Sequence, residues 1–77
     1  MPTIFRENGY RFFFFSNEHL PKHIHIEKSD KYLKVEIETL NILNNFKMTS
    51  KEQKEVIDII SKHQKDFLEA WNEYFNR

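Results

Sequence analysis

Two histidines in the segment PKHIHIEK, residues 21–28, have the residue types and spacing best suited to chemistry. His23 and His25 are separated by one apolar residue, so both lie on the same face if the segment is a β-strand. Histidine titrates near neutral pH, acts as a general acid or base, and binds divalent metals. The segment therefore predicts either a small chemical site or a strand whose outward positions are histidine.

A catalytic site is the first of three interpretations that the sequence leaves open. A metal-independent ribonuclease needs a base, an acid and a cation beside the scissile phosphate. Two imidazoles would supply the acid and the base, lysine and arginine would hold the phosphate, and nearby aromatic rings would stack on unpaired bases. The candidate catalytic residues on this interpretation are His23, His25, Lys34 and Arg11.

Metal binding is the second interpretation of the same face. Imidazoles at positions i and i+2 of a strand can share a metal ion, with Glu27 or Glu36 as the third ligand. An isolated H-x-H pattern lacks the further ligands that define a metal site by spacing. We therefore expect no metal and no other cofactor.

A protein interface is the third interpretation, and it requires no chemistry. Phe13 and Phe15 share a face with Arg11, so the strand beside the histidines would add aromatic surface to that face. Aromatic residues and arginine are enriched in interface cores. The remaining alternative is that the histidines are half exposed and have no specific role.

The other two histidines carry weaker signals. His63 lies on the apolar stripe of the expected helix, so we expect it to be a core or boundary residue. His19 lies in a loop near His23 and would join a site only if that loop folds over the sheet.

Strands over the first half of the chain must position these residues. Asn8-Gly9 favours a two-residue hairpin turn, and Ser29-Asp30 is the expected turn after the histidines. With that turn, His25 lies opposite Lys34. The sequence does not determine the conformation of segment 40–48, because Leu40–Phe46 fits either a short edge strand or an irregular connection. The expected strands cover about 3–6, 10–15, 23–28 and 32–37.

One long helix is predicted over about 50–75. Thr49 and Glu52 have capping-box spacing at its start, and apolar residues recur every three or four positions after Val56. Such a helix is about 39 Å long at 1.5 Å per residue, whereas a compact domain of this size is only about 30 Å across.

The end of this helix should therefore extend beyond the sheet. We expect its aromatic side chains to pack against a second subunit or a partner, unless Leu40–Phe46 folds back to cover them. Together with the outward phenylalanines, the expected interface residues are Phe13, Phe15, Trp71, Tyr74 and Phe75.

Composition limits the classes of protein that this chain can belong to. The 77 residues include 12 basic and 12 acidic side chains and no cysteine. The charge balance is not that of a dedicated nucleic-acid binder, and the chain has no disulfide or thiolate metal site. Because no apolar run approaches the ~20 residues of a membrane span and the start lacks signal-peptide features, we expect a cytoplasmic protein without membrane association.

We therefore predict a single α+β domain over residues 1–77. Its antiparallel sheet has about four strands, and one long C-terminal helix packs on one face. So short a chain buries a limited core, which favours association with another chain.

Three segments together are similar to a known family. MPTIFRENGYRFFFFSNE at 1–18, PKHIHIEK at 21–28 and LEAWNEYF at 68–75 resemble small bacterial proteins grouped as domain of unknown function 4160. Members commonly have glycine in the hairpin after H-x-H, where this chain has Ser29 and Lys31. Lys34 matches a lysine that the family often carries after that turn.

The resemblance implies a component of a two-gene module of the toxin–antitoxin type, but no catalytic residue can be carried over from it. We expect a protein that acts through protein association, with an RNA-directed, ribonuclease-like activity left open. The alternative is a non-enzymatic, dimeric binding or regulatory module. The expected partner is a second copy or a small cognate protein, RNA remains an open partner, and the sequence does not decide whether the protein is an enzyme.

Overall fold

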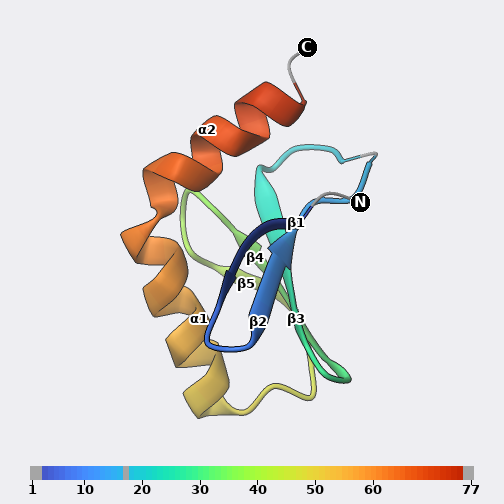
Figure 1. The fold of residues 1–77 in the computed structure, drawn as a ribbon, viewed down its shortest axis with the longest axis vertical. Coiled ribbons are helices and arrows are strands. Elements are labelled where there is room, and N and C mark those ends of the chain that lie inside the picture. Colours follow the sequence, from blue (N-terminus) through green and yellow to red (C-terminus); the bar gives the residue numbers. More distant parts are fainter. Residues whose placement is uncertain (1–2, 17, 76–77) are drawn as a thin grey trace.

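A five-stranded antiparallel sheet and two helices form the protein, as a computed structural model that describes residues 3–16 and 18–75 shows (Figure 1). The α+β class predicted from the sequence is confirmed. The strands are β1 (Thr3–Glu7), β2 (Tyr10–Phe13), β3 (His23–Lys28), β4 (Lys31–Glu36) and β5 (Ile42–Phe46). The helices are α1 (Ser50–Lys62) and α2 (Gln64–Tyr74).

Each strand pairs with its neighbour in the sequence, so the spatial order is β1-β2-β3-β4-β5. Asn8 and Gly9 have φ values of 54° and 82°, as a tight hairpin turn with two left-handed residues requires. Ser29 has a φ of 56° in the turn between β3 and β4. This turn therefore keeps its two-residue form without a glycine.

The core lies between one face of the sheet and the two helices, which Figure 1 shows on the same side. Alternate residues of β3 and β4, such as Ile24 and Val35, are fully buried against α1 residues such as Val56 and Ile60. The alternation of β2 brings Tyr10 and Phe12 into the same core. The histidines of β3 therefore project from the opposite face.

The segment that the sequence left open is a fifth strand. Leu40 has a φ of 65°, and its N–H donates to the carbonyl oxygen of Glu36 at 2.9 Å, which closes a turn after β4. The chain then returns as β5 along the free edge of β4. Pairing satisfies backbone groups that β4 would otherwise present unpaired. The sheet thus has five strands instead of about four, and β5 extends the sheet without covering the end of the helix.

The single long helix of the prediction is interrupted at His63. This residue has φ −114° and ψ 20°, and it separates α1 from α2. The His63 ring lies 4.6 Å from that of Phe5, and the Gln64 side chain donates to the carbonyl oxygen of Ile37 at 2.7 Å. These contacts hold the junction against the sheet. The longest dimension of the domain is 35 Å, below the ~39 Å of a straight helix over 50–75.

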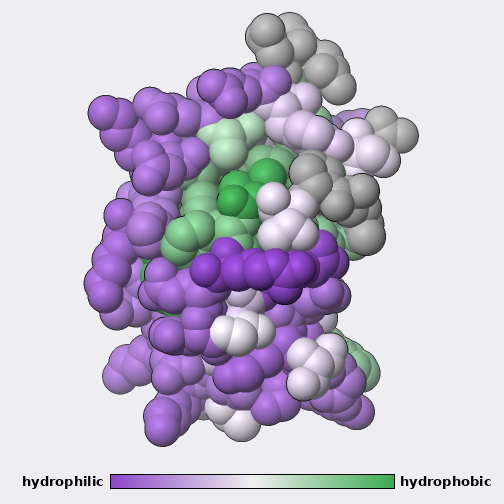
Figure 2. All heavy atoms as spheres, viewed as in Figure 1, coloured by the Kyte–Doolittle hydropathy of each residue, from purple (hydrophilic) through white to green (hydrophobic). Residues whose placement is uncertain are grey.

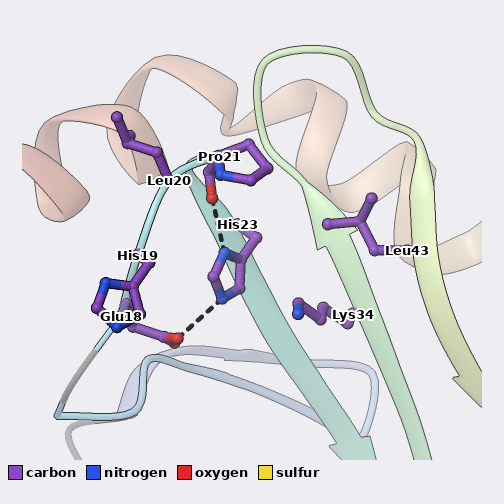
Figure 3. Close-up of a pocket in the computed structure, with 7 residues that line it drawn as sticks. All are labelled: Glu18, His19, Leu20, Pro21, His23, Lys34 and Leu43. Carbon is purple, nitrogen blue, oxygen red and sulfur yellow. Dashed lines mark hydrogen bonds and ion pairs between the residues drawn. The ribbon is translucent and has the colours of Figure 1, made fainter.

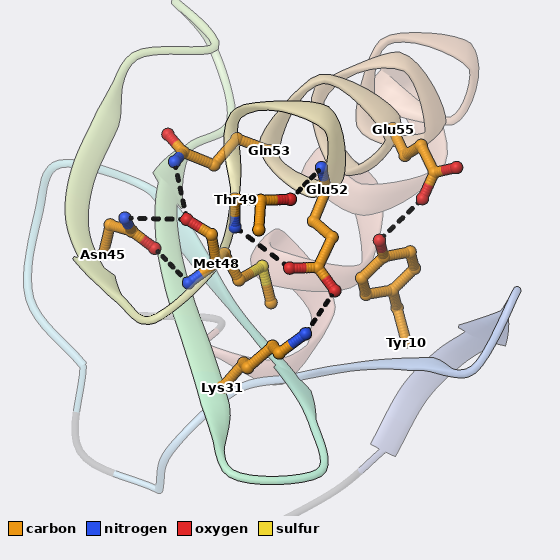
Figure 4. Close-up of polar contacts among 8 residues, drawn as sticks. All are labelled: Tyr10, Lys31, Asn45, Met48, Thr49, Glu52, Gln53 and Glu55. Carbon is orange, nitrogen blue, oxygen red and sulfur yellow. Dashed lines mark hydrogen bonds and ion pairs between the residues drawn. The ribbon is translucent and has the colours of Figure 1, made fainter.

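The start of α1 is tied to the sheet by side-chain hydrogen bonds (Figure 4). The predicted capping box is present: the Glu52 N–H donates to Thr49 Oγ1, and the Thr49 N–H donates to Glu52 Oε1. Lys31 Nζ on β4 donates to the other carboxylate oxygen of Glu52 at 2.7 Å. Neither helix in the described part of the chain is both long and apolar enough to span a membrane.

Candidate histidine–carboxylate site

The two histidines of β3 lie on the sheet face opposite the helices, as the alternation predicts. His25 lies opposite Lys34, as predicted, and His23 lies opposite Glu36. Their environment rules out the alternative of half-exposed histidines, because His23 and His25 are only 5% and 3% exposed. Some of the residues that cover them come from the connection between β2 and β3.

Glu18, in that connection, contacts both imidazoles. Its Oε1 lies 2.8 Å from Nε2 of His23, and its Oε2 lies 2.6 Å from Nε2 of His25. The carboxylate side chain is only 6% exposed and also accepts the N–H of Phe15 at 3.0 Å. One carboxylate therefore joins two buried histidines.

The other nitrogen of each imidazole also has a partner. Nδ1 of His23 lies 2.7 Å from the carbonyl oxygen of Pro21, and Nδ1 of His25 lies 2.6 Å from the hydroxyl of Tyr32. We call Glu18, His23, His25 and Tyr32 the histidine cluster. All four of its imidazole nitrogens are engaged, so both rings have fixed orientations.

The identity of these partners determines where hydrogens lie in the histidine cluster. A carbonyl oxygen only accepts, so Nδ1 of His23 carries a hydrogen. Its Nε2 faces a carboxylate oxygen at 2.8 Å, and two acceptors require a proton between them at that distance. His25 is satisfied in its neutral form when Nε2 donates to Glu18 and Nδ1 accepts from Tyr32. His23 and Glu18 therefore share one proton, which links the two side chains by a hydrogen bond.

Burial and hydrogen bonding act on the ionisation of these groups in opposite directions. Burial raises the pKa of Glu18, but the Phe15 N–H and the two histidines outweigh it, and the pKa lies below its ordinary value. Burial lowers the pKa of His25 and outweighs the opposing effect of the Glu18 carboxylate. Burial, followed by the charge of Glu18, raises the pKa of Tyr32. An ionised Glu18 beside a neutral His25 agrees with the hydrogen-bond geometry.

Aromatic rings enclose the histidine cluster. The His25 ring stacks on Phe13 with centroids 5.4 Å apart and lies 4.2 Å from Phe15. The His23 ring lies 5.4 Å from that of Trp71, which comes from α2. The cluster is thus shielded by residues from β2, the following loop and the C-terminal helix.

A pocket of about 200 Å³ adjoins the histidine cluster at Glu18 and His23 (Figure 3). Lys34 and Leu43 border it from β4 and β5, as the close-up shows. His19 also lines the pocket, because its loop folds over the sheet. This was the condition under which His19 was expected to join a site. The remaining lining residues are Leu20 and Pro21.

Comparison with known proteins identifies the family. A family model described as "Domain of unknown function (DUF4160)" matches residues 9–72. The chain belongs to the DUF4160 family. No curated protein and no solved structure matches it significantly. The matched region extends from the first turn to α2 and includes all four residues of the histidine cluster.

The structure of this DUF4160 protein separates the candidate catalytic residues of the sequence into two groups. His23 and His25 lie together, and Lys34 borders the adjoining pocket. Arg11 instead donates to Glu27 Oε1 at 2.8 Å and lies over the ring of Phe13. The carboxylate on the histidines is Glu18, and not Glu27 or Glu36 as the metal interpretation supposed.

The expected interface residues differ in how much surface they offer. Phe13 and Trp71 are buried within the chain, where Trp71 packs against Phe14. The chain bends at His63, so α2 runs in a different direction from α1 (Figure 1). Phe15 and Tyr74 are partly exposed, and Phe75 is partly buried against the core.

An apolar area remains where α2 passes β1, as the upper half of Figure 2 shows. A pocket there is lined by Ile4, Ala70, Glu73 and Tyr74. Tyr74 therefore remains available for contact with another molecule at this end of the domain.

Sequence reasoning did not identify Glu18 and Tyr32 as site residues. Tyr32 does lie on the same face as Lys34 by alternation, diagonally across from His25. Glu18 gives no periodic signal, because it lies in a loop. The available signal was the H-x-H pair itself, since two histidines covered by a loop require a polar partner from that loop.

Proposed function

We propose that this DUF4160 protein acts through protein association, as a cytoplasmic component of a two-gene module of the toxin–antitoxin type. We also propose that β5 is the surface through which two copies pair. The supporting observation is that all five residues of β5 are exposed, although the strand belongs to the sheet. A strand of this kind is a template for pairing with another chain.

β5 combines an open edge with apolar side chains. It is the last strand of the sheet and pairs with β4 on one side. The exposed fraction is 54% for Phe46, 40% for Ile42 and 43% for Leu43. Natural edge strands are usually protected by charges, proline or β-bulges, which discourage pairing. β5 has a register irregularity near Leu43, but it contains no charged residue and no proline.

A second copy is the occupant that the charge pattern favours. The strand ILNNF has no charged residue, so an antiparallel pair of β5 strands brings no like charges together. The whole chain has a formal net charge of zero, so two copies do not repel each other at long range. A strand edge paired with its own copy about a two-fold axis also gives a closed dimer.

An apolar groove beside β5 adds area to such an interface. Ile42 and Ile57 line it together with the side chains of Ser50, Gln53 and Lys54, and its volume is about 420 Å³. The groove lies between β5 and α1. Pairing through β5 would bring the second copy next to α1, so the interface extends from the strand to the helix.

The test is the solution mass of the purified chain over a range of concentrations, measured by light scattering or analytical ultracentrifugation. We expect a species of twice the 9.5 kDa chain mass. Leu43→Lys should shift it to the monomer, because it places like charges at the paired edge. Leu20→Lys is the matched control: Leu20 lines the same pocket as Leu43, but it lies outside β5.

Three results would contradict pairing of two copies through β5. These are a native chain that stays monomeric at high concentration, a Leu43→Lys variant that stays dimeric, and equal disruption by Leu20→Lys. If the native chain is monomeric but binds the product of the adjacent gene, and Leu43→Lys abolishes that binding, β5 is occupied by a cognate partner.

An RNA-directed activity receives less support from the geometry. All four imidazole nitrogens of the histidine cluster already have partners, and Arg11 is bound to Glu27. A general base must have a free lone pair within reach of the proton that it removes. Protein association therefore explains more of the described structure than ribonuclease chemistry does.

A further inference from the structure

The geometry points to a binding site for one divalent transition-metal ion, with Glu18, His23 and His25 as ligands. The three ligands lie outside β5, and the inference does not rest on the proposed association. The three side chains each offer one ligand atom, and these atoms all lie within 4.8 Å of one another. Two imidazoles and a carboxylate are the donor set of several zinc sites and of non-haem iron(II) sites.

Burial is the first argument for a cation at this place. The side chains of Glu18, His23 and His25 are 6%, 6% and 3% exposed. Removing ionisable groups from water is costly, and buried groups of this kind are usually paired or coordinate a metal. Three of them converge here from a loop and a strand.

The orientation of the imidazoles is the second argument. Nδ1 of His23 donates to the Pro21 carbonyl, so Nε2 is the nitrogen that faces the Glu18 carboxylate and that a metal would bind once the shared proton has left. The hydroxyl of Tyr32 can accept as well as donate, so it can hold His25 with a hydrogen on Nδ1 and a free Nε2. Metal-ligating histidines typically donate their second N–H to a carbonyl or a similar acceptor.

A metal cation can replace the proton that His23 and Glu18 now share. The two Nε2–carboxylate distances are 2.6 and 2.8 Å, as hydrogen bonds require. Metal bonds of about 2.0–2.1 Å in tetrahedral geometry separate ligand atoms by about 3.3 Å. Ligand atoms that now lie up to 4.8 Å apart must therefore approach each other, and the carboxylate must withdraw from each Nε2 by roughly 0.6 Å. Glu18 can make this adjustment because it lies in a loop, whereas both histidines belong to β3.

The adjoining pocket provides the remaining coordination position. It is lined by both Glu18 and His23, so a water molecule or a small ligand can reach an ion held by them (Figure 3). Three protein ligands and one open position are the arrangement of catalytic zinc sites. Lys34 on the pocket wall would favour an anionic ligand there.

The test begins with the native chain after removal of metals by a chelator. Isothermal titration with Zn²⁺ should show one equivalent bound, and Zn²⁺ should raise the melting temperature, whereas Mg²⁺, which prefers an oxygen-only shell, should do neither. Nitrogen NMR of the imidazoles gives a second measurement that needs no variant. Zn²⁺ should shift Nε2 of His23 and His25 and leave His63 unchanged.

Substitution then tests the ligand set. Glu18→Gln should weaken Zn²⁺ binding by about tenfold or more, since it removes a charged ligand. His63→Gln is the control, because His63 lies at the helix junction and its loss should leave the affinity unchanged. Circular dichroism of both variants verifies the fold.

Several results would overturn the metal site. The site is excluded if the native chain does not bind Zn²⁺, or if Zn²⁺ does not shift the imidazole signals of His23 and His25. It is also excluded if Glu18→Gln leaves the affinity for Zn²⁺ unchanged. Equal loss of binding in His63→Gln would also overturn it. Co²⁺ provides a further check, because an ion bound by these ligands should show the intense visible absorption of tetrahedral coordination.

Discussion

At the residue scale, the histidine cluster shows how burial creates a demand for partners. A polar side chain on the outer face of a sheet usually forms its hydrogen bonds with water. His23 and His25 cannot do so, because a loop and aromatic rings cover them. Their nitrogens are satisfied by a carboxylate, a carbonyl and a hydroxyl. Within residues 3–16 and 18–75, no buried side-chain nitrogen or oxygen lacks a hydrogen-bond partner.

The contribution of Tyr32 to stability can be measured directly. Tyr32→Phe removes the hydroxyl 2.6 Å from Nδ1 of His25 and leaves that buried nitrogen without a partner. The free energy of unfolding in urea should fall by about 1–3 kcal/mol, the cost of leaving a buried polar group unsatisfied.

Tyr74→Phe is the matched control for Tyr32→Phe, because Tyr74 is exposed near the end of α2. It should change the free energy of unfolding by less than about 0.5 kcal/mol, as exposed substitutions do. Equal effects of the two substitutions would show that the hydroxyl of Tyr32 does not stabilise the cluster.

At the element scale, Glu52 joins the start of α1 to the sheet. Its carboxylate accepts from the Thr49 N–H within the capping box and from Lys31 on β4 (Figure 4). The hydrogen bond from Lys31, followed by that from the backbone of Thr49, lowers the pKa of Glu52 from 4.5 to about 2. The ionised form is therefore the one that the fold favours.

This pKa predicts how stability depends on pH. Because the pKa of Glu52 is lower in the folded chain, its contribution is present above pH 4.5 and is lost as the pH falls toward 2. The difference in melting temperature between the native chain and Glu52→Gln should therefore be largest near neutral pH and should shrink between pH 4.5 and 2.

Glutamine is a suitable replacement for Glu52 because it can still accept from the Thr49 N–H at this capping position. The comparison therefore isolates the charge, and other acidic groups that titrate in the same range affect both proteins. A difference that stays constant down to pH 2 would contradict the role of the ionised carboxylate.

At the scale of the whole molecule, Trp71 connects parts that are distant in the sequence. Its ring lies 5.5 Å from Phe14 in the core, 5.4 Å from His23 in the histidine cluster and 4.4 Å from Phe75. The side chain is buried, although it belongs to the helical end that was expected to extend beyond the sheet. Packing of α2 on the sheet is therefore part of the same core that α1 covers.

This continuity predicts a single cooperative unfolding transition. Trp71 is the only tryptophan, so its fluorescence reports on α2, whereas circular dichroism reports on all the secondary structure. The two signals should give the same midpoint in urea, because small domains with one core unfold in one step. An earlier fluorescence transition would show that α2 separates from the sheet before the rest unfolds.

Local patterns in the sequence determined most of the secondary structure. Alternation in residues 23–28 and 32–37 established which face of β3 and β4 enters the core, and it placed His25 opposite Lys34. The Asn8-Gly9 turn and the Thr49–Glu52 capping box were predicted for the same reason. Each depends on residues that are close in the chain or paired by a short turn, so spacing alone defines it.

Tertiary structure decided the features that depend on contacts across the chain. The break at His63 follows from packing against Phe5 and from the hydrogen bond of Gln64 to Ile37. Glu18 joins the histidines because a loop without periodicity folds over β3. No spacing rule predicts such a contact, since the conformation of a loop is determined by what it covers. The sequence thus determined which face carries the histidines, and only the fold buried them and supplied their carboxylate.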